Sequence, residues 1–297
     1  MLIHQGPFVG HRGARGSAPE NTFAAFREGY RQGANSIELD VGLSADQQFY
    51  VLHDDTLERT TNGTGRLDQT SSQQLDRLDA GSWYGPQYAG EHVPKLADVL
   101  DWAKDRIHVT IEVKTSAVAP GVGRRLIEMV EARQMAEQVA IVSFSPEVIA
   151  EVEQVRPSFD TGLLLSERPT LGRIKAGAQL GLALGVAGAL VGCSNPLAGL
   201  GVVAASVALG GLAGKAVSAL ENHRQLSKTP ADAIMPFWID ADRGLARAAA
   251  KKGKRMVPYT ANNPWLVGSL LKGGASAVIT DTPGRFTGSP NEKERPA

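Results

Sequence analysis

The feature that most constrains this chain is the repeated ending of an apolar run on ionisable residues. This occurs at His11-Arg12, Glu38-Leu39-Asp40, His53-Asp54, Glu112-Val113-Lys114 and Thr280-Asp281. Charged side chains in a buried strand are costly unless they are paired. Because parallel strands end at the same edge of a sheet, the pattern predicts acids, bases and cations gathered on one rim.

Strand-like runs alternate with helix-compatible segments, which predicts parallel β-α units. The predicted strands are 8–11, 36–41, 49–53, 108–113, 139–144, 161–165, 234–238, 255–260 and 277–280. The predicted helices are 21–33, 96–104, 123–133, 146–155, 244–252 and 264–272. A TIM (β/α)8 barrel needs eight strands and roughly 250 residues. We therefore expect an α/β barrel over residues 1–287, with one of 161–165 and 234–238 short or outside it.

Composition narrows the classes of partner. Lys plus Arg equals Asp plus Glu at 31 each, so no global field favours nucleic acid or an anionic surface. The single cysteine, Cys193, excludes an intrachain disulfide framework and a cysteine-based zinc site. The first residues lack a basic region followed by a long apolar stretch, so a cytoplasmic protein is expected. The polar tail at 288–297 predicts disorder.

Three carboxylates and two histidines dominate the predicted rim. Glu38 and Asp40 are two apart on a strand, so their side chains leave on the same face. With Glu112 from another strand, they offer the oxygen ligands that Mg²⁺ or Ca²⁺ prefers. His11 and His53 are the last residues of two further predicted strands, and histidine is suited to proton transfer near neutral pH. The set predicts acid–base chemistry beside a metal ion.

Arg12 and Lys114 add cations suited to phosphate, the first as a planar fork and the second as a point charge. One His-Arg-Gly or one Glu-x-Asp is common on protein surfaces. Their conjunction is different, because buried parallel strands are normally apolar on both faces. The combination favours a phosphate-processing site over a set of surface ion pairs.

At these residues the chain resembles the glycerophosphodiester phosphodiesterase family. The matching motifs are Val9-Gly10-His11-Arg12-Gly13, Pro19-Glu20-Asn21-Thr22, Ile37-Glu38-Leu39-Asp40-Val41, His53-Asp54, Ile111-Glu112-Val113-Lys114, Ser143-Phe144 and Val278-Ile279-Thr280-Asp281 with Pro283. The resemblance implies a TIM barrel in which 55–94 corresponds to the family's small insertion after the third strand. It also implies hydrolysis of glycerophosphodiesters to an alcohol and sn-glycerol 3-phosphate, through a cyclic phosphate formed by the neighbouring glycerol hydroxyl.

The resemblance also implies roles for single residues. Glu38, Asp40 and Glu112 would be the ligands of a divalent metal, Mg²⁺ or Ca²⁺. His11 and His53 would be the acid–base pair, and Arg12 and Lys114 would hold the phosphate. Glu20 would support the site or approach the metal.

Two further expectations concern Tyr259 and the pair Asn21 and Thr22. Tyr259 stands where the family usually has tryptophan, so we expect an aromatic wall with altered substrate packing. Asn21 and Thr22 are interpreted as the start of a helix, because either side chain can accept from free backbone N–H groups there.

A glycine-rich insert at 171–225 is not part of the family pattern. Residues 176–214 contain no charged side chain, and Gly177, Gly181 and Gly185 recur every four residues. On a helix that spacing makes a smooth groove for a second helix. The arms 176–192 and 197–214 therefore predict a helical hairpin. Each arm is near the lower limit for crossing a bilayer, so membrane insertion and soluble packing on the barrel or on a second subunit both remain open.

Two alternatives stand beside diester hydrolysis. The insert would bring a lysophospholipid to the rim if the reaction were of the lysophospholipase D type. A non-catalytic membrane scaffold is the second alternative, and the presence of every rim residue expected for chemistry argues against it.

Overall fold

The computed structural model describes residues 6–165, 179, 182–183 and 196–287. It forms two compact units, Met1–Leu164 with Thr229–Ala297, and Leu165–Lys228. The first arm of the predicted hairpin and the tail at 288–297 lie largely outside the described residues.

Among the described residues, eight parallel strands form the barrel sheet of the first unit. They are β1 (Phe8–Gly10), β2 (Ser36–Leu43), β4 (His108–Val113), β5 (Val139–Ser143), β6 (Asp160–Leu164), β7 (Ala233–Met235), β8 (Arg255–Met256) and β9 (Val278–Thr280). Their order is β8-β7-β6-β5-β4-β2-β1-β9. Backbone hydrogen bonds from Ser276 N to Met256 O (2.9 Å) and from Ile279 N to Pro258 O (3.0 Å) join the segments at the two ends of this order. The predicted TIM barrel is confirmed.

The prediction that one of 161–165 and 234–238 lies outside the barrel is wrong, because both contribute barrel strands, β6 and β7. The alternative of a short strand agrees with β7, which covers three residues. The additional strand is β3 (Phe49–Val51), which pairs antiparallel with the end of β2, Val41 opposite Val51. Because β2 continues to Leu43 and the chain then reverses, His53 reaches the rim from a returning strand rather than from a parallel one.

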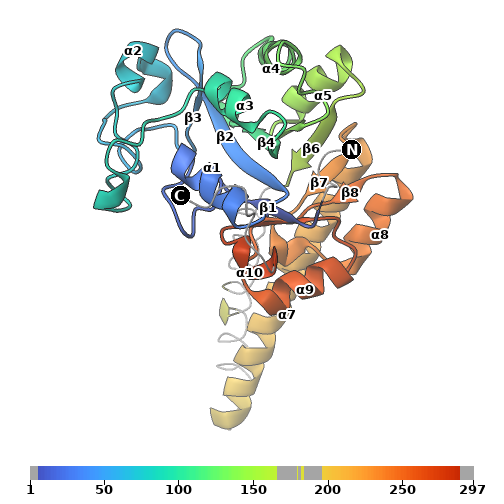
Figure 1. Cartoon of the computed structure of the whole chain (residues 1–297). Helices are drawn as coiled ribbons and strands as arrows, with labels where there is room; N and C mark the ends of the chain where they lie inside the picture. Colours follow the sequence, from blue (N-terminus) through green and yellow to red (C-terminus); the bar gives the residue numbers. More distant parts are fainter. Residues whose placement is uncertain (1–5, 166–178, 180–181, 184–195, 288–297) are drawn as a thin grey trace. The chain divides into compact units, whose positions relative to one another are not determined.

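All six predicted helices are present (Figure 1). They are α1 (Phe23–Arg31), α3 (Leu96–Ala103), α4 (Val122–Glu131), α5 (Pro146–Val155), α8 (Arg243–Lys251) and α9 (Pro264–Lys272), followed by the short α10 (Gly284–Thr287). Side-chain oxygens of Thr22, Ser145, Asp242 and Asn263 accept from the first-turn N–H groups of α1, α5, α8 and α9. These N-caps fix where the four helices begin.

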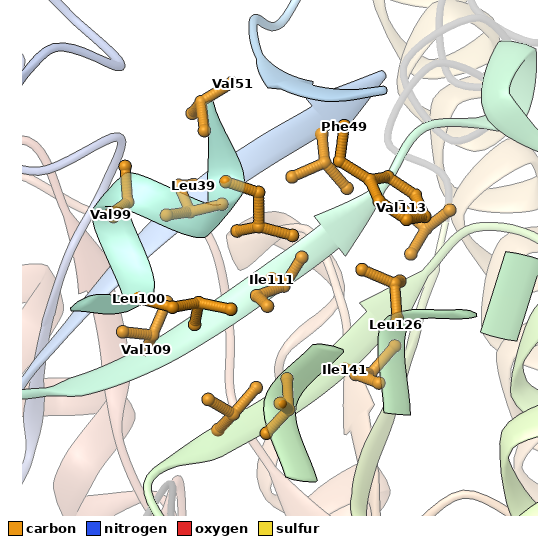
Figure 2. Close-up of a cluster of buried hydrophobic side chains, with 14 of the residues drawn as sticks. Leu39, Phe49, Val51, Val99, Leu100, Val109, Ile111, Val113, Leu126 and Ile141 are labelled. Carbon is orange, nitrogen blue, oxygen red and sulfur yellow. The ribbon is translucent and has the colours of Figure 1, made fainter. Parts of the chain in front are cut away.

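The two faces of each strand have different neighbours. Leu39 of β2, Val109 and Ile111 of β4 and Ile141 of β5 belong to the apolar layer between the sheet and its outer helices, which Figure 2 shows. The barrel interior is filled by a second cluster, which includes Val9, Val142, Met235, Val257 and Ile279. Because side chains alternate along a strand, Glu38, Asp40 and Glu112 leave on the interior face.

The segment 55–94 packs as a small subdomain after β3. It contains the 3-10 helix η2 (Leu67–Gln69), α2 (Ser72–Leu75) and the 3-10 helix η3 (Pro86–Tyr88). Its apolar cluster includes Leu57, Leu67, Leu75, Ala80 and Val93 together with Tyr50 and Leu52. Tyr88 donates a hydrogen bond from its hydroxyl to Ser17 O (3.0 Å), so the subdomain contacts the loop that follows β1.

The second unit contains α7 (Pro196–Lys228). This helix begins at the start of the second predicted arm, 197–214, but continues past Gly214 to Lys228. Within the part of the chain that the structure describes, no helix is long and apolar enough to cross a membrane. The choice between the two hypotheses for the insert stays a prediction.

Candidate active site

Three buried carboxylates come together inside the barrel. Glu38 and Asp40 belong to β2 and Glu112 to β4, with Asp40 directly opposite Glu112 in the register of the two strands. One oxygen from each lies within 4.8 Å of the other two. Like charges opposite one another destabilise a strand pair unless a cation compensates them. The three predicted metal ligands therefore form one cluster, as the sequence predicted.

The electrostatics of the cluster favour an added cation. Burial, reinforced by Asp40 and Glu112, raises the pKa of Glu38 well above its usual range. Burial and Asp40 together raise the pKa of Glu112 to about 7. Burial also opposes the charge on Asp40, but Arg12 and Lys114 outweigh it and hold the pKa of that carboxyl below its usual range. Oxygen ligands with this excess of negative charge fit Mg²⁺ or Ca²⁺.

Arg12 and Lys114 lie against the same carboxylates. The Arg12 backbone N donates to Glu38 Oε2 (2.9 Å), and its Nε lies 3.2 Å from Asp40 Oδ2. Lys114 Nζ donates to Glu112 Oε1 (2.7 Å) and lies 3.4 Å from Asp40 Oδ1. Both cations are thus placed beside the predicted metal ligands, where a bound phosphate would need them.

Each predicted catalytic histidine is held by an aspartate. His11 Nδ1 lies 2.6 Å from Asp281 Oδ1, and His53 Nδ1 lies 2.6 Å from Asp54 Oδ1. A carboxylate at Nδ1 holds the proton there and leaves Nε2 to exchange a proton with a substrate. Burial is the main cause that lowers the pKa of both imidazoles. A lowered pKa favours the neutral imidazole, which is the form that accepts a proton as a general base.

Glu20 lies on the cationic side of the site. Its carboxylate accepts hydrogen bonds from Arg12 Nη1 (2.6 Å) and from two nitrogens of Arg59. Of the two roles that the resemblance left open for Glu20, this placement agrees with support of the site.

Tyr259 lies in an aromatic group that packs on the barrel interior. Its ring centroid is 6.1 Å from that of Phe144 and 6.1 Å from that of Phe237. These rings follow β5, β7 and β8, at the same end of the barrel as the charged residues. Tyr259 therefore belongs to a group of three aromatic rings at this end of the barrel.

Some neighbours of the site were not anticipated. Asp54 and Asp281 belong to the matching motifs but carry no role in the sequence-based prediction, and no motif contains Arg59 or Asn262.

Asn21 does not start α1 as predicted, because Thr22 alone caps this helix. Asn21 has a φ of 59° and donates from Nδ2 to Asp40 Oδ2 (2.9 Å). The signal available in the motif was the adjacent pair of asparagine and threonine, because asparagine adopts positive φ more readily than most residues.

Comparison with known proteins agrees with this geometry. The sequence pattern of the Glycerophosphoryl diester phosphodiesterase family matches residues 11–285. The chain belongs to this family. Membership confirms the predicted enzyme class, a phosphoric diester hydrolase.

Individual family members cover nearly the whole chain. A glycerophosphodiester phosphodiesterase from Caldanaerobacter subterraneus subsp. tengcongensis is 28% identical over 277 residues, 93% of each chain. The crystal structure of one from Agrobacterium tumefaciens has a TM-score of 0.66 at 27% identity, covering 97% of this chain and 100% of that one. An Oleispira antarctica phosphodiesterase in complex with the product sn-glycerol-3-phosphate has a TM-score of 0.69 at 22% identity, covering 95% and 96%.

Proposed function

We propose that this family member hydrolyses glycerophosphodiesters to an alcohol and sn-glycerol 3-phosphate, with Mg²⁺ or Ca²⁺ held by Glu38, Asp40 and Glu112. The observation that carries the proposal is the cluster of three buried carboxylates within 4.8 Å. Two histidines, each held at Nδ1 by an aspartate, complete the chemistry that the reaction requires. The names of the Caldanaerobacter and Oleispira proteins describe the same class of activity and the same product.

Arg12 and Lys114 have the chemistry to bind the phosphodiester group. Each now contacts carboxylates that would also serve as metal ligands. A divalent ion, when bound, would polarise the phosphoryl oxygens and take over part of this charge compensation. The guanidinium and ammonium donors would then be available to the phosphate oxygens.

His11 and His53 would carry the protons. One imidazole takes the proton of the glycerol hydroxyl while that oxygen bonds to phosphorus. The other, as the imidazolium with a second proton on Nε2, gives that proton to the leaving alcohol oxygen as its bond to phosphorus breaks. Water then opens the cyclic phosphate, and the two imidazoles exchange roles.

The aromatic group of Phe144, Phe237 and Tyr259 is proposed to contact the substrate. Its rings pack at the catalytic end of the barrel, where an apolar surface lies next to the charged cluster. An aromatic face accommodates a glycerol backbone and, by cation–π attraction, a quaternary ammonium group. Tyr259→Ala is therefore expected to raise KM more than it lowers kcat.

The test is a substrate panel with each metal supplied in turn. Purified protein with Mg²⁺ or Ca²⁺ should release sn-glycerol 3-phosphate from glycerophosphocholine, whereas Glu38→Ala and His11→Ala should not. Full activity in either variant would refute the residue assignment. Faster release of choline from lysophosphatidylcholine than from glycerophosphocholine would favour the lysophospholipase D alternative. The absence of both metal binding and turnover would support a non-catalytic scaffold.

A further inference from the structure

We propose that Arg59 is a positioning residue of the active site. One guanidinium group holds both the carboxylate that orients His53 and the carboxylate that holds Arg12. The functional part of this inference rests on the roles proposed above for His53 and Arg12.

The guanidinium of Arg59 contacts two carboxylates at once. Its Nη2 donates to Asp54 Oδ1 (3.0 Å), and its Nε donates to Asp54 Oδ2. On the other side, Nη1 donates to Glu20 Oε2 (3.1 Å) and Nη2 donates to Glu20 Oε1 (2.8 Å). Both pairs are two-point contacts, which fix the relative orientation of the partners as well as their separation.

Each carboxylate shares one oxygen between Arg59 and a catalytic group. Asp54 Oδ1 contacts Arg59 Nη2 and also His53 Nδ1, at 2.6 Å. Glu20 Oε1 accepts from Arg59 Nη2 and from Arg12 Nη1, the latter at 2.6 Å. A continuous chain of contacts therefore runs from the imidazole of His53 through Arg59 to the guanidinium of Arg12.

The backbone around Arg59 is fixed by the subdomain. Leu57 is buried, and its N donates to Gly65 O (3.0 Å). Thr61 donates from N (3.1 Å) and from Oγ1 (2.7 Å) to Leu57 O. Arg59 therefore projects from a closed turn, and the hydrogen bonds that close this turn do not use the Arg59 side chain.

Both carboxylates are charged over the range in which the enzyme would be assayed. Burial opposes the charge on Glu20, but Arg59 and Arg12 lower its pKa to about 2. Burial likewise opposes the charge on Asp54, and Arg59 and His53 lower its pKa to about 2. Removing Arg59 would leave one carboxylate with His53 alone and the other with Arg12 alone, so both could reorient.

Lysine cannot replace this geometry. Its single ammonium nitrogen offers a point charge, whereas Arg59 uses three nitrogens on four oxygens. Arg59→Lys retains the positive charge but loses the two-point contacts with Asp54 and Glu20. A purely electrostatic role for Arg59 would therefore survive this substitution, and a positioning role would not.

The chain offers a matched control in Arg66. It lies in the same subdomain, its side chain is 42% exposed against 43% for Arg59, and it too makes a two-point contact, with Asp68. Arg66→Ala removes the same side chain and one ion pair of the subdomain. Its hydrogen bonds to Asp68 reach no residue of the site.

The kinetic test compares wild type, Arg59→Ala, Arg59→Lys and Arg66→Ala on glycerophosphocholine with saturating metal. Loss of a residue that orients catalytic groups typically costs 10–100-fold. We expect kcat to fall by about this factor in both Arg59 variants, with KM raised because Arg12 is no longer held. Free guanidinium ion should restore part of the activity of Arg59→Ala and none in Arg59→Lys. Arg66→Ala should match wild type.

A second measurement does not depend on turnover. In protein labelled with ¹⁵N-histidine, neutral His53 of wild type should carry its proton on Nδ1, and His53→Asn identifies its signals. Arg59→Ala should move the proton toward Nε2, whereas Arg66→Ala should leave the nitrogen shifts unchanged. Thermal unfolding of each variant shows whether it is folded. If Arg59→Ala is not folded, Arg59→Lys replaces it in this comparison.

The outcomes separate the two proposals. Inactive wild type across the diester panel would refute the proposed function, and the His53 nitrogen shifts would still decide the role of Arg59. Nitrogen shifts of His53 that are identical in wild type and in the folded Arg59 variants would overturn the positioning role, whatever the kinetics show.

Discussion

Asparagine at position 281 should remove most of the activity while keeping the shape of the site. Asp281 contacts His11 Nδ1 through Oδ1 (2.6 Å) and accepts from Asn262 Nδ2 through Oδ2 (2.6 Å). Asn262 cannot turn its amide around, because its Oδ1 accepts from Asp281 N (2.8 Å) and from Thr280 Oγ1 (3.0 Å). The new amide must therefore present its oxygen to Asn262 and its NH₂ to His11.

That orientation places the proton of His11 on the wrong nitrogen. An NH₂ group donating to Nδ1 requires the proton on Nε2, so this nitrogen can no longer accept one. Arg15 Nε lies 3.5 Å from Asp281 Oδ1, which is too far for a hydrogen bond strong enough to reverse the orientation of the new amide. General acid–base catalysis contributes about 10²–10⁴, and the equivalent change in serine proteases costs about 10⁴. We expect kcat to fall by about 10³, or about 4 kcal/mol of transition-state stabilisation.

The assay is kcat for glycerophosphocholine with saturating metal, measured for wild type, Asp281→Asn and Asp281→Ala. Alanine leaves His11 free to adopt either tautomer, so its loss should be smaller, about 10–100-fold. The expected order is therefore wild type, then Asp281→Ala, then Asp281→Asn. Activity of Asp281→Asn within about twofold of wild type, in a variant with unchanged thermal unfolding, would refute the reasoning.

Three further predictions concern pH and the insert. Because the pKa of Glu112 is raised to about 7, the metal-free folded protein should lose stability as pH rises from about 4.5 to 7. Glu112→Gln should remove roughly 3 kcal/mol of that loss. Chemical denaturation in EDTA that gives wild type and Glu112→Gln the same pH dependence of stability would contradict this prediction. The lowered pKa values of His11 and His53 keep the catalytic base deprotonated at mildly acidic pH, so the acidic limb of kcat/KM should have its midpoint below about 6.5, and a midpoint above 7 would argue against it. The membrane hypothesis for the insert predicts that replacing residues 176–214 by a short linker moves the protein from the membrane pellet to the supernatant while largely sparing hydrolysis of soluble diesters. Unchanged fractionation would count against membrane anchoring.

The barrel and its carboxylate cluster could be predicted because a strand repeats every two residues. In Ile37-Glu38-Leu39-Asp40-Val41 the apolar positions pack outward and the acids face inward, and this alternation is local. The direction of β3 was not predictable in the same way. Residues 49–53 have the same apolar pattern in a parallel or an antiparallel pair, and only the reversal after Leu43 decides between them.

The residues that hold the catalytic groups were missed for a different reason. Arg59 contacts Glu20, which is 39 residues away in the chain, and Asn262 contacts Asp281, which is 19 residues away. Such contacts depend on which turns meet at the rim, and the periodicity of a local segment does not predict them. Asn21 shows the same limit, because its backbone conformation decides whether its side chain caps α1 or reaches Asp40.

The most direct test of the metal site is calorimetric titration of Mg²⁺ and Ca²⁺ into metal-free wild type and Glu38→Gln, with sn-glycerol 3-phosphate release measured on the same samples. Three carboxylates around one ion predict a single site per chain and parallel recovery of activity. Loss of one ligand should weaken binding by more than about tenfold. Equal affinity in Glu38→Gln, or full turnover of wild type in EDTA, would contradict the assignment of Glu38, Asp40 and Glu112 as the metal site.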